Sequence, residues 1–292
     1  MTQQLDSRFS NVSPEASEGL RRLRGILAEC GRAVVGYSGG IDSTFLLWAA
    51  LGRLGKEHVL GVTGVSPSLA NAQLEEAVRQ AREMGAPHRL IRTAEVEDPR
   101  YLANAPDRCY HCKSELYARL LEIARAEGFD RVLDGSNLDD TRDVRPGFRA
   151  IRERGVESPL LAARLGKDAI RELSRAAGLR AWDRPASPCL SSRVPHGTPI
   201  TLETLSRIEK GEAFLRAYVR GPLRLRTRGR DARIEVDRAE IPALLAPGTR
   251  EAVEEGLRAL GYASVTVDPA GYRQGGADLP LPARRDPLRT GG

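Results

Sequence analysis

The stretch AVVGYSGGIDSTFLL, residues 33–47, decides the fold. Ala33–Tyr37 is a short apolar run rich in β-branched residues and has the length of a buried parallel strand, while Thr44–Leu54 has the apolar spacing of a helix. Between them, Gly39 and Gly40 allow positive φ angles and a close approach of the backbone to a ligand. The first amide groups of the following helix carry partial positive charge. The stretch therefore predicts a strand-to-helix turn that binds an anion.

The rest of the first two thirds of the chain alternates strand-like and helix-like segments. This alternation predicts an α/β fold with a doubly wound parallel sheet, whose ligands bind at the carboxyl ends of the strands. The further expected strands are Val59–Val65, His88–Arg92 and Arg131–Asp134, and the expected helices are Leu69–Met84, Leu116–Ala126 and Asp168–Ala177.

The order of elements changes after the turn-rich segment VPHGTPI, residues 194–200. A helix, a strand pair, two helices and a last strand then predict a small α+β domain. These are Leu202–Val219, Leu223–Arg228 with Ala232–Val236, Arg238–Leu245, Arg250–Leu260 and Ala263–Val267. We expect residues 1–198 to form the nucleotide-binding domain, 199–276 a substrate and oligomerisation domain, and 277–292 a flexible tail.

The composition narrows the class of protein. The chain has 45 basic and 39 acidic residues and a net charge of +6, but only four of the basic residues are lysines. No dense basic run with interleaved aromatic residues appears, so the charge does not favour a nucleic-acid partner. No apolar run reaches membrane-spanning length and the first residues lack a signal-peptide pattern, so we expect a cytoplasmic protein without a membrane partner.

The loop of residues 38–43 differs from two common phosphate-binding motifs. It lacks the Gly-Lys-Ser/Thr ending of a P-loop and the Gly-x-Gly-x-x-Gly of a dinucleotide-binding fold. It resembles the PP-loop, Ser-Gly-Gly-x-Asp-Ser, of the ATP pyrophosphatase superfamily, whose members cleave ATP between the α and β phosphates. The resemblance implies ATP as ligand, with Ser38 and Ser43 as hydroxyl donors and Asp42 as an oxygen ligand of Mg²⁺. The alternative is a glycine turn followed by an ordinary helix cap.

Five further stretches resemble the LarE-like family of ATP-dependent sulfur transferases, which act in the maturation of lactate racemase. They are GVTGVSPS (61–68), RCYHCKSELY (108–117), DGSNLDDTRDVRPG (134–147), SPCLSSRVPHG (187–197) and LRLRTRGRDARIEV (223–236). The resemblance implies an adenine nucleotide alpha hydrolase-like fold and a pyridinium bis-carboxylate mononucleotide as substrate. The carboxylates are adenylated and become thiocarboxylates, which later hold nickel in a pincer-type cofactor. It also implies a sulfide donor, a downstream nickel-inserting protein and a homo-oligomer such as a hexamer.

The same motifs supply the expected nucleotide site. The residues expected to bind ATP with the loop are Gly39, Gly40, Ser66, Lys113, Asn137 and Arg193. Asp139 or Asp140, after the fourth strand, could help to hold Mg²⁺. Alternatively, the two aspartates form a helix N-cap and a solvated acidic pair.

Two arginines mark the expected substrate site. Arg224 and Arg226 alternate with Leu223 and Leu225, so both arginines leave one face of a strand while the leucines enter a core. Guanidinium groups suit phosphate or carboxylate ligands. The resemblance adds Glu212, on the preceding helix, to this site. The alternative is a solvated strand face.

The chain has four cysteines. Cys30 stands alone on a helical segment and is expected to be a small buried residue. Cys189 lies where the resembling family carries its sulfur-delivering cysteine, which in one branch gives up its own sulfur and becomes dehydroalanine. Cys109 and Cys112 have the bite of a metal-binding turn, and with Cys189 they predict three ligands of a 4Fe–4S cluster whose open iron binds sulfide. A sacrificial Cys189, a redox pair, or a zinc site completed by His111 or His196 are the alternatives.

Two rival functions remain at this point. A tRNA thiolase of the same superfamily would adenylate a base carbonyl, but such enzymes carry additional zinc or RNA-binding modules that are not visible here. A nucleotide sensor without catalytic activity would have no use for three of the cysteines.

Overall fold

The computed structural model describes residues 8–142, 146–184 and 187–273, so the tail expected over 277–292 lies outside the described residues. The chain divides into two compact units, Met1–Pro188 and Cys189–Gly292. Each unit has its own sheet and its own hydrophobic core. The sequence-based domain limits at residues 198 and 276 stay predictions.

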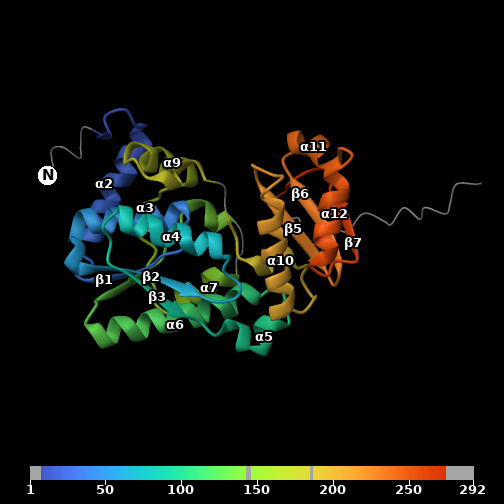
Figure 1. The fold of residues 1–292 in the computed structure, drawn as a ribbon. Helices are drawn as coiled ribbons and strands as arrows, with labels where there is room; N and C mark the ends of the chain where they lie inside the picture. Colours follow the sequence, from blue (N-terminus) through green and yellow to red (C-terminus); the bar gives the residue numbers. More distant parts are fainter. Residues whose placement is uncertain (1–7, 143–145, 185–186, 274–292) are drawn as a thin grey trace, which may run out of the picture. The chain divides into compact units, whose positions relative to one another are not determined.

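The first unit is built around a parallel sheet with the strand order β3-β2-β1-β4 (Figure 1). The strands are β1 (Ala33–Gly36), β2 (Val59–Val65), β3 (His88–Arg92) and β4 (Arg131–Leu133). In register, Val34 of β1 pairs with Leu60 on one side and Val132 on the other. The expected doubly wound α/β fold is confirmed, because parallel neighbours require crossover connections and helices supply them on both faces.

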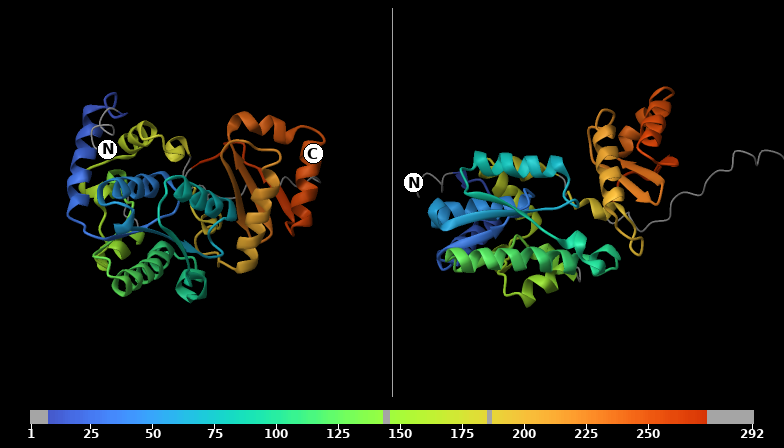
Figure 2. Two further views of the ribbon diagram at one scale, coloured as in Figure 1. Left: turned by 60° about the vertical axis from the view of Figure 1, so that its left-hand side comes forward. Right: turned by 60° about the horizontal axis from the view of Figure 1, so that its bottom comes forward.

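Helices cover both faces of this sheet, as Figure 1 and the two further views in Figure 2 show. On one face lie α2 (Pro14–Ala28), α3 (Ile41–Leu54), α4 (Asn71–Glu83) and α9 (Lys167–Ala176), and on the other α6 (Arg108–Glu127) and α7 (Pro146–Glu153). Shorter helices in this unit are α5 (Pro99–Leu102) and α8 (Pro159–Ala162). Among the residues that the structure describes, no helix combines the length and apolar character needed to cross a lipid bilayer.

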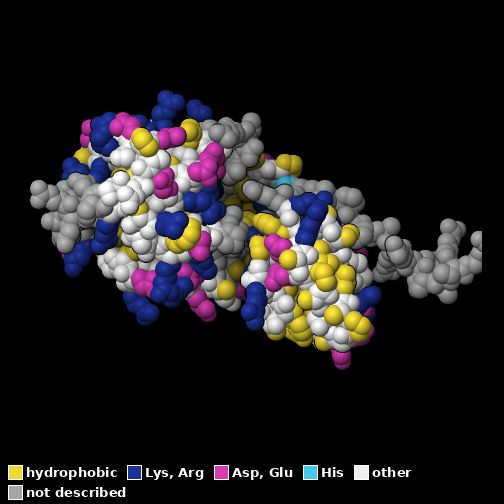
Figure 3. Space-filling view, turned by 90° about the horizontal axis from the view of Figure 1, so that it is seen from above, with side chains coloured by type: hydrophobic (Ala, Val, Ile, Leu, Met, Phe, Trp, Pro, Cys, Tyr) yellow, Lys and Arg dark blue, Asp and Glu magenta, His cyan; other side chains and the backbone are white. Residues whose placement is uncertain are grey.

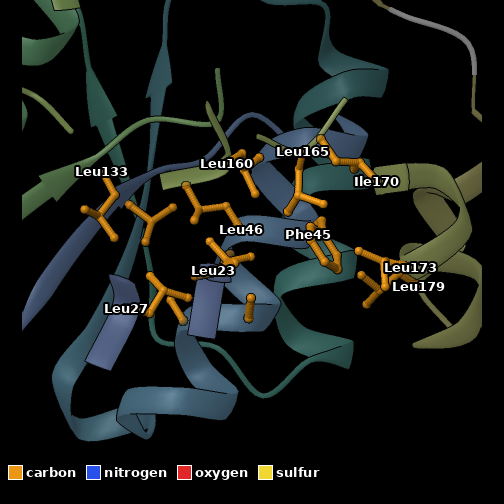
Figure 4. Packing of buried hydrophobic residues seen from close by; sticks show 14 of the residues in the cluster. Leu23, Leu27, Phe45, Leu46, Leu133, Leu160, Leu165, Ile170, Leu173 and Leu179 are labelled. Carbon is orange, nitrogen blue, oxygen red and sulfur yellow. The ribbon is translucent and has the colours of Figure 1, made fainter. Parts of the chain in front are cut away.

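The core under α2 and α3 brings together large aliphatic side chains from distant segments. Leu23 and Leu27 of α2 point toward Leu46 of α3, and Phe45 of α3 points toward Leu173 of α9 (Figure 4). All five side chains are fully buried, and each buried side chain of this size contributes about 1.5–3 kcal/mol. This packing holds the start of α3, and therefore the glycine loop before it, on a rigid base.

Two expectations about the cysteine-bearing helices need correction. The helix expected to begin at Leu116 begins at Arg108, so Cys109 and Cys112 lie among its first five residues. Polar residues in this segment hide the apolar period, which is why the sequence pattern misses it. Cys30 lies just beyond α2; it is buried, as expected, and its thiol donates to the Ile26 carbonyl at 3.4 Å.

The second unit contains a three-stranded sheet in the order β5-β6-β7. Its elements are α10 (Leu202–Leu215), β5 (Leu223–Arg228), β6 (Asp231–Val236), α11 (Ile241–Leu245), α12 (Thr249–Ala259) and β7 (Ser264–Val267). β5 and β6 are antiparallel, whereas β6 and β7 are parallel. The expected second, smaller α+β sheet unit is therefore present.

Candidate active site

The glycine loop lies at the carboxyl end of β1, where it leads into α3. The Ser38 amide donates to the Ser43 hydroxyl at 3.2 Å, and the two serine hydroxyls are 3.1 Å apart. Among the described residues, no side chain caps the start of α3 at Gly40. The first amides of the helix and two hydroxyls therefore meet at one point, which suits an anionic group.

Helix α4 fixes the conformation of this loop. Gly39 has a φ of +71°, and a Cβ atom there would lie 2.8 Å from the Ala77 Cβ and 2.9 Å from its Cα. Gln80 donates to the Gly39 carbonyl at 3.3 Å, and the Tyr37 hydroxyl donates to the Ala77 carbonyl at 3.1 Å. The loop thus requires glycine at position 39 for both its backbone angle and its contact with α4.

We expect Gly39→Ala to lower the free energy of unfolding by at least about 1–2 kcal/mol, the cost of a left-handed conformation for a residue with a Cβ, and to weaken ATP binding. Gly40→Ala is the matched control for stability, because Gly40 has a φ of −74° and its Cβ would meet only the Ser38 hydroxyl, at 3.4 Å. Urea unfolding and nucleotide titration measure both effects. Equal stability of the two variants would contradict this interpretation.

Asp42, in the first turn of α3, is paired with a residue that sequence reasoning missed. Its Oδ2 atom binds the Nζ atom of Lys167, the first residue of α9 and 125 positions away in the chain. Its Oδ1 atom is buried, and no described residue forms a hydrogen bond with it. Burial raises the pKa of the Asp42 carboxyl, and Lys167 opposes this shift. No local pattern predicts this pair, because its members come from distant segments.

The segment after β4 supplies further carboxylates at the same edge of the sheet. Asp139 accepts a hydrogen bond from the Lys167 backbone amide at 2.6 Å, and Asp140 accepts one from the Asn137 amide at 3.0 Å. The charge of Asp140 also raises the pKa of Asp42, so these two carboxylates lie close enough to interact. Asp42 has a buried oxygen that no described residue binds, and a second carboxylate lies beside it. This arrangement fits Mg²⁺, which binds one or two carboxylates together with phosphate oxygens.

Ser66 follows β2 and contacts a buried glutamate that the sequence did not single out. The hydroxyls of Ser66 and Ser68 donate to Oε1 of Glu95, the latter at 3.0 Å. Glu95 is only 3% exposed, and its Oε2 atom has no hydrogen-bond partner among the described residues. In sequence, Glu95 belongs to the charged segment EVED, which is typical of a solvated surface.

Lys113, on α6, reaches the carboxyl end of β4. Its Nζ atom lies 3.4 Å from Oδ2 of Asp134, and the Tyr117 hydroxyl donates to the same oxygen. Burial of Asp134 raises the pKa of its carboxyl group. The charge of Lys113 and hydrogen bonds from Ser136 and Tyr117 lower this pKa by more, so that it lies below its ordinary value. Asp134 therefore stays ionised and fixes Lys113 at this edge of the sheet.

The structure gives the cysteines different surroundings. Cys109 is exposed and Cys112 half-buried, and their spacing of three residues places both thiols on one side of α6. Cys189 is half-buried in the second unit, directly before the 3₁₀ turn Leu190–Arg193. Within the described residues, no group of three or more His, Cys, Asp or Glu side chains is placed to hold a metal ion. The expected three-cysteine set draws on both units and stays a prediction.

In the second unit, Arg193 and Glu212 form a two-pronged ion pair. Arg193 Nε and Nη2 each lie 2.9 Å from an oxygen of Glu212, and Arg193 Nη1 donates to the Cys189 carbonyl at 3.0 Å. Glu212 also accepts from the Leu225 amide at 3.0 Å. Arg193, expected at the nucleotide, and Glu212, expected at the substrate, thus together tie the Cys189 turn to β5.

The two expected substrate arginines lie on β5, opposite the leucines of the core, as the alternation predicts. Arg224 and Arg226 are only 6% and 4% exposed, so the alternative of a solvated strand face is wrong. Arg226 donates to Glu235 at 2.9 Å and to the Ser192 carbonyl at 2.8 Å. The Arg224 guanidinium lies 5.2 Å from the centre of the Tyr272 ring, and burial and the charge of Arg193 lower its pKa.

Sequence reasoning missed the buried charges next to these arginines. Glu235, which is fully buried, binds Arg233 at 2.9 Å as well as Arg226, and Asp268 lies 3.6 Å from Arg233. In the part of the second unit that the structure describes, Arg193, Arg224, Arg226 and Arg233 are all buried. Clustered guanidinium groups of this kind suit an anionic ligand.

Comparison with known proteins agrees with this architecture, although no protein-family model matches the chain. The chain is 41% identical over 256 residues to an uncharacterised protein of Synechocystis sp., covering 88% of this chain and 95% of that protein. It is 35% identical over 249 residues to the pyridinium-3,5-bisthiocarboxylic acid mononucleotide synthase of Lactiplantibacillus plantarum, covering 85% of this chain and 90% of the synthase. An NH₃-dependent NAD⁺ synthetase of Methanococcoides burtonii is 29% identical over 154 residues, half of this chain.

The synthase identifies the family, and the NAD⁺ synthetase identifies the wider superfamily. The expected adenine nucleotide alpha hydrolase-like fold is confirmed by the parallel sheet and by this similarity. The chain is an ATP-using enzyme of the PP-loop superfamily and belongs to the LarE family of pyridinium-3,5-bisthiocarboxylic acid mononucleotide synthases.

Proposed function

We propose that this enzyme is an ATP-dependent sulfur transferase that converts the carboxylates of a pyridinium bis-carboxylate mononucleotide into thiocarboxylates. The similarity to the Lactiplantibacillus plantarum synthase, over 85% of the chain, carries this proposal. The glycine loop, which leads from β1 into α3 as a nucleotide site requires, supports it.

The first half-reaction would activate the carboxylate. A carboxylate oxygen of the substrate attacks the α phosphorus of ATP, the bond to the β phosphate breaks, and pyrophosphate leaves. The α3 amides, Ser38, Ser43 and Lys113 would neutralise the charge that accumulates on the leaving group. Mg²⁺, held by Asp42 and Asp140, would supply further charge neutralisation at the phosphates.

The second half-reaction would introduce sulfur. Hydrosulfide attacks the activated carbonyl carbon, and AMP leaves with the former carboxylate oxygen. We propose that Cys109, Cys112 and Cys189 ligate a 4Fe–4S cluster, which would supply an open iron site for sulfide from a donor. The thiol pair on α6 supports this choice, because a sacrificial Cys189 would need no partner cysteines. A nickel-inserting protein would then receive the product.

The second unit would recognise the mononucleotide through Arg224, Arg226 and Glu212. Guanidinium groups match the phosphate and carboxylates of such a substrate, and Arg224 and Arg226 are almost fully buried. On the face of the first unit seen in Figure 3, Lys and Arg side chains are interspersed with Asp and Glu. As in the resembling family, we propose that the enzyme works as a homo-oligomer.

We expect Arg224→Ala to weaken mononucleotide binding by about tenfold to a hundredfold, the effect of losing one charge-assisted contact, and to leave ATP binding unchanged. Arg228→Ala is the matched control, because Arg228 is the exposed last residue of the same strand. Calorimetric titration with the mononucleotide and separately with ATP measures both affinities. Equal substrate affinities of the two variants would remove Arg224 from the site.

The proposed function is tested by anaerobic incubation of the enzyme with ATP, Mg²⁺, sulfide and the mononucleotide. We expect AMP and pyrophosphate to form only when the mononucleotide is present, together with a product mass in which sulfur replaces oxygen. Formation of ADP and phosphate, or of AMP without any sulfur-containing product, would contradict the proposal.

A further inference from the structure

The glycine loop has no lysine of its own, but the fold brings one to it. Lys167 is the first residue of α9, and its ammonium binds the carboxylate of Asp42 in the first turn of α3. The Lys167 backbone amide also binds Asp139 at 2.6 Å, which fixes the start of α9 at the same place. A lysine ammonium therefore lies close to the point where the amides of α3 favour an anion.

This pair does not satisfy Asp42 completely. Oδ1 of Asp42 is buried and has no hydrogen-bond partner among the residues described, whereas Oδ2 is bound by Lys167. A metal ion that occupied the unsatisfied side of the carboxylate would neutralise it and reduce its attraction for the ammonium. The Lys167 side chain is 35% exposed and has a flexible four-carbon stem, so it is free to move to a neighbouring acceptor.

We propose that Lys167 is a phosphate-binding residue of the nucleotide site, whose ammonium leaves Asp42 for a phosphate oxygen when Asp42 binds Mg²⁺. The inference rests on the proposed use of ATP at the glycine loop. It assigns to Lys167 the role that a lysine within the loop performs in P-loop proteins, although the two lysines occupy unrelated positions in sequence. No covalent step is involved, because the Lys167 ammonium only changes its ionic partner from the Asp42 carboxylate to a phosphate oxygen.

The competing interpretation is that Lys167 only joins α3 to α9. Asp42 and Lys167 would then stabilise the first unit and contribute nothing to the binding of phosphate. The two interpretations differ in a quantity that does not depend on catalysis, namely the affinity for inorganic pyrophosphate.

The test is calorimetric titration of the full-length protein with inorganic pyrophosphate in the presence of Mg²⁺. We expect Lys167→Met to weaken pyrophosphate binding by about tenfold to a hundredfold and Lys167→Arg to weaken it less, because arginine keeps the charge. Lys56→Met is the matched control; Lys56 lies before β2, at the opposite end of the strands, and its side chain is 73% exposed. Its affinity is expected to equal that of the unchanged protein.

A second arm uses Asp42→Asn with the metal removed by a chelator. If Lys167 exchanges between Asp42 and phosphate, loss of the carboxylate removes a competitor and metal-free pyrophosphate binds more tightly than to the unchanged protein. Equal pyrophosphate affinity of Lys167→Met and the unchanged protein, with only a lower unfolding temperature, would overturn the inference and leave the proposed function intact. Failure of the unchanged protein to bind pyrophosphate with Mg²⁺ would overturn both.

Discussion

Asp42→Asn is expected to reduce adenylation by about a hundredfold to a thousandfold, the typical loss when one preorganised charge stabiliser of a transition state is removed. Asparagine has the shape of aspartate but not its charge, so it is a poor ligand for Mg²⁺. The Oδ1 atom of Asp42 is buried and has no hydrogen-bond partner in the described ranges, so it is the oxygen that a metal ion would use. Pyrophosphate release at increasing Mg²⁺ concentrations measures the effect.

The fold is expected to survive this substitution. Burial already raises the pKa of Asp42, so a neutral side chain relieves part of the desolvation cost while the Lys167 contact is lost. Asp168→Asn is the matched control, because Asp168 is likewise an aspartate in the first turn of a helix but is exposed to solvent. An adenylation rate of Asp42→Asn equal to that of the control would show that Asp42 does not hold the metal.

Single substitutions Cys109→Ala, Cys112→Ala and Cys189→Ala are expected to cause equal and nearly complete loss of bound iron and of sulfur transfer. Ligands of one cluster act as a unit, so the effect of removing one is similar to that of removing all. The α6 variants are expected to fold, because alanine favours the helix and neither side chain is fully buried. Iron and sulfide analysis of anaerobic preparations, with turnover measured in parallel, gives the result.

Cys30→Ala is the matched control for these three variants, because Cys30 is a buried thiol in the core and takes no part in the proposed site. It is expected to retain iron and turnover. The sacrificial mechanism predicts a different result. Only Cys189 would be essential, and the protein would lose the mass of hydrogen sulfide after one turnover. A fully active Cys109→Ala protein with dehydroalanine at position 189 would overturn the cluster.

The parts of the fold that local sequence determines were predictable. Strands β2, β3 and β5 have the bounds expected from their apolar and alternating patterns. The loop before α3 was predictable because glycines, hydroxyls and a carboxylate follow one another within six residues. Residues 143–145 of the motif after β4 lie outside the described residues, so that part of the motif stays a prediction.

The partners of the site residues were not predictable, for a physical reason. Lys167, Glu95 and Asp134 each act through a contact with a segment far away in the chain, and nothing in their neighbouring residues indicates that contact. The same holds for Glu235, which on its strand alternates with apolar residues like any solvated charge, and yet is fully buried between two arginines. The alternation of polar and apolar residues in a sequence predicts that a segment is a strand, but it does not show which residues cover the polar face of that strand.

The contact between Gly39 and Ala77 restricts which sequences this fold accepts. Ala77 of α4 is fully buried against the loop, and a Cβ at position 39 would lie only 2.8 Å from its methyl group. We therefore expect a larger side chain at position 77, such as valine or leucine, to press on the loop whose backbone approaches the nucleotide. Substitutions at these two positions are therefore not independent, and a helix that bears no proposed ligand limits how the nucleotide site can change during evolution.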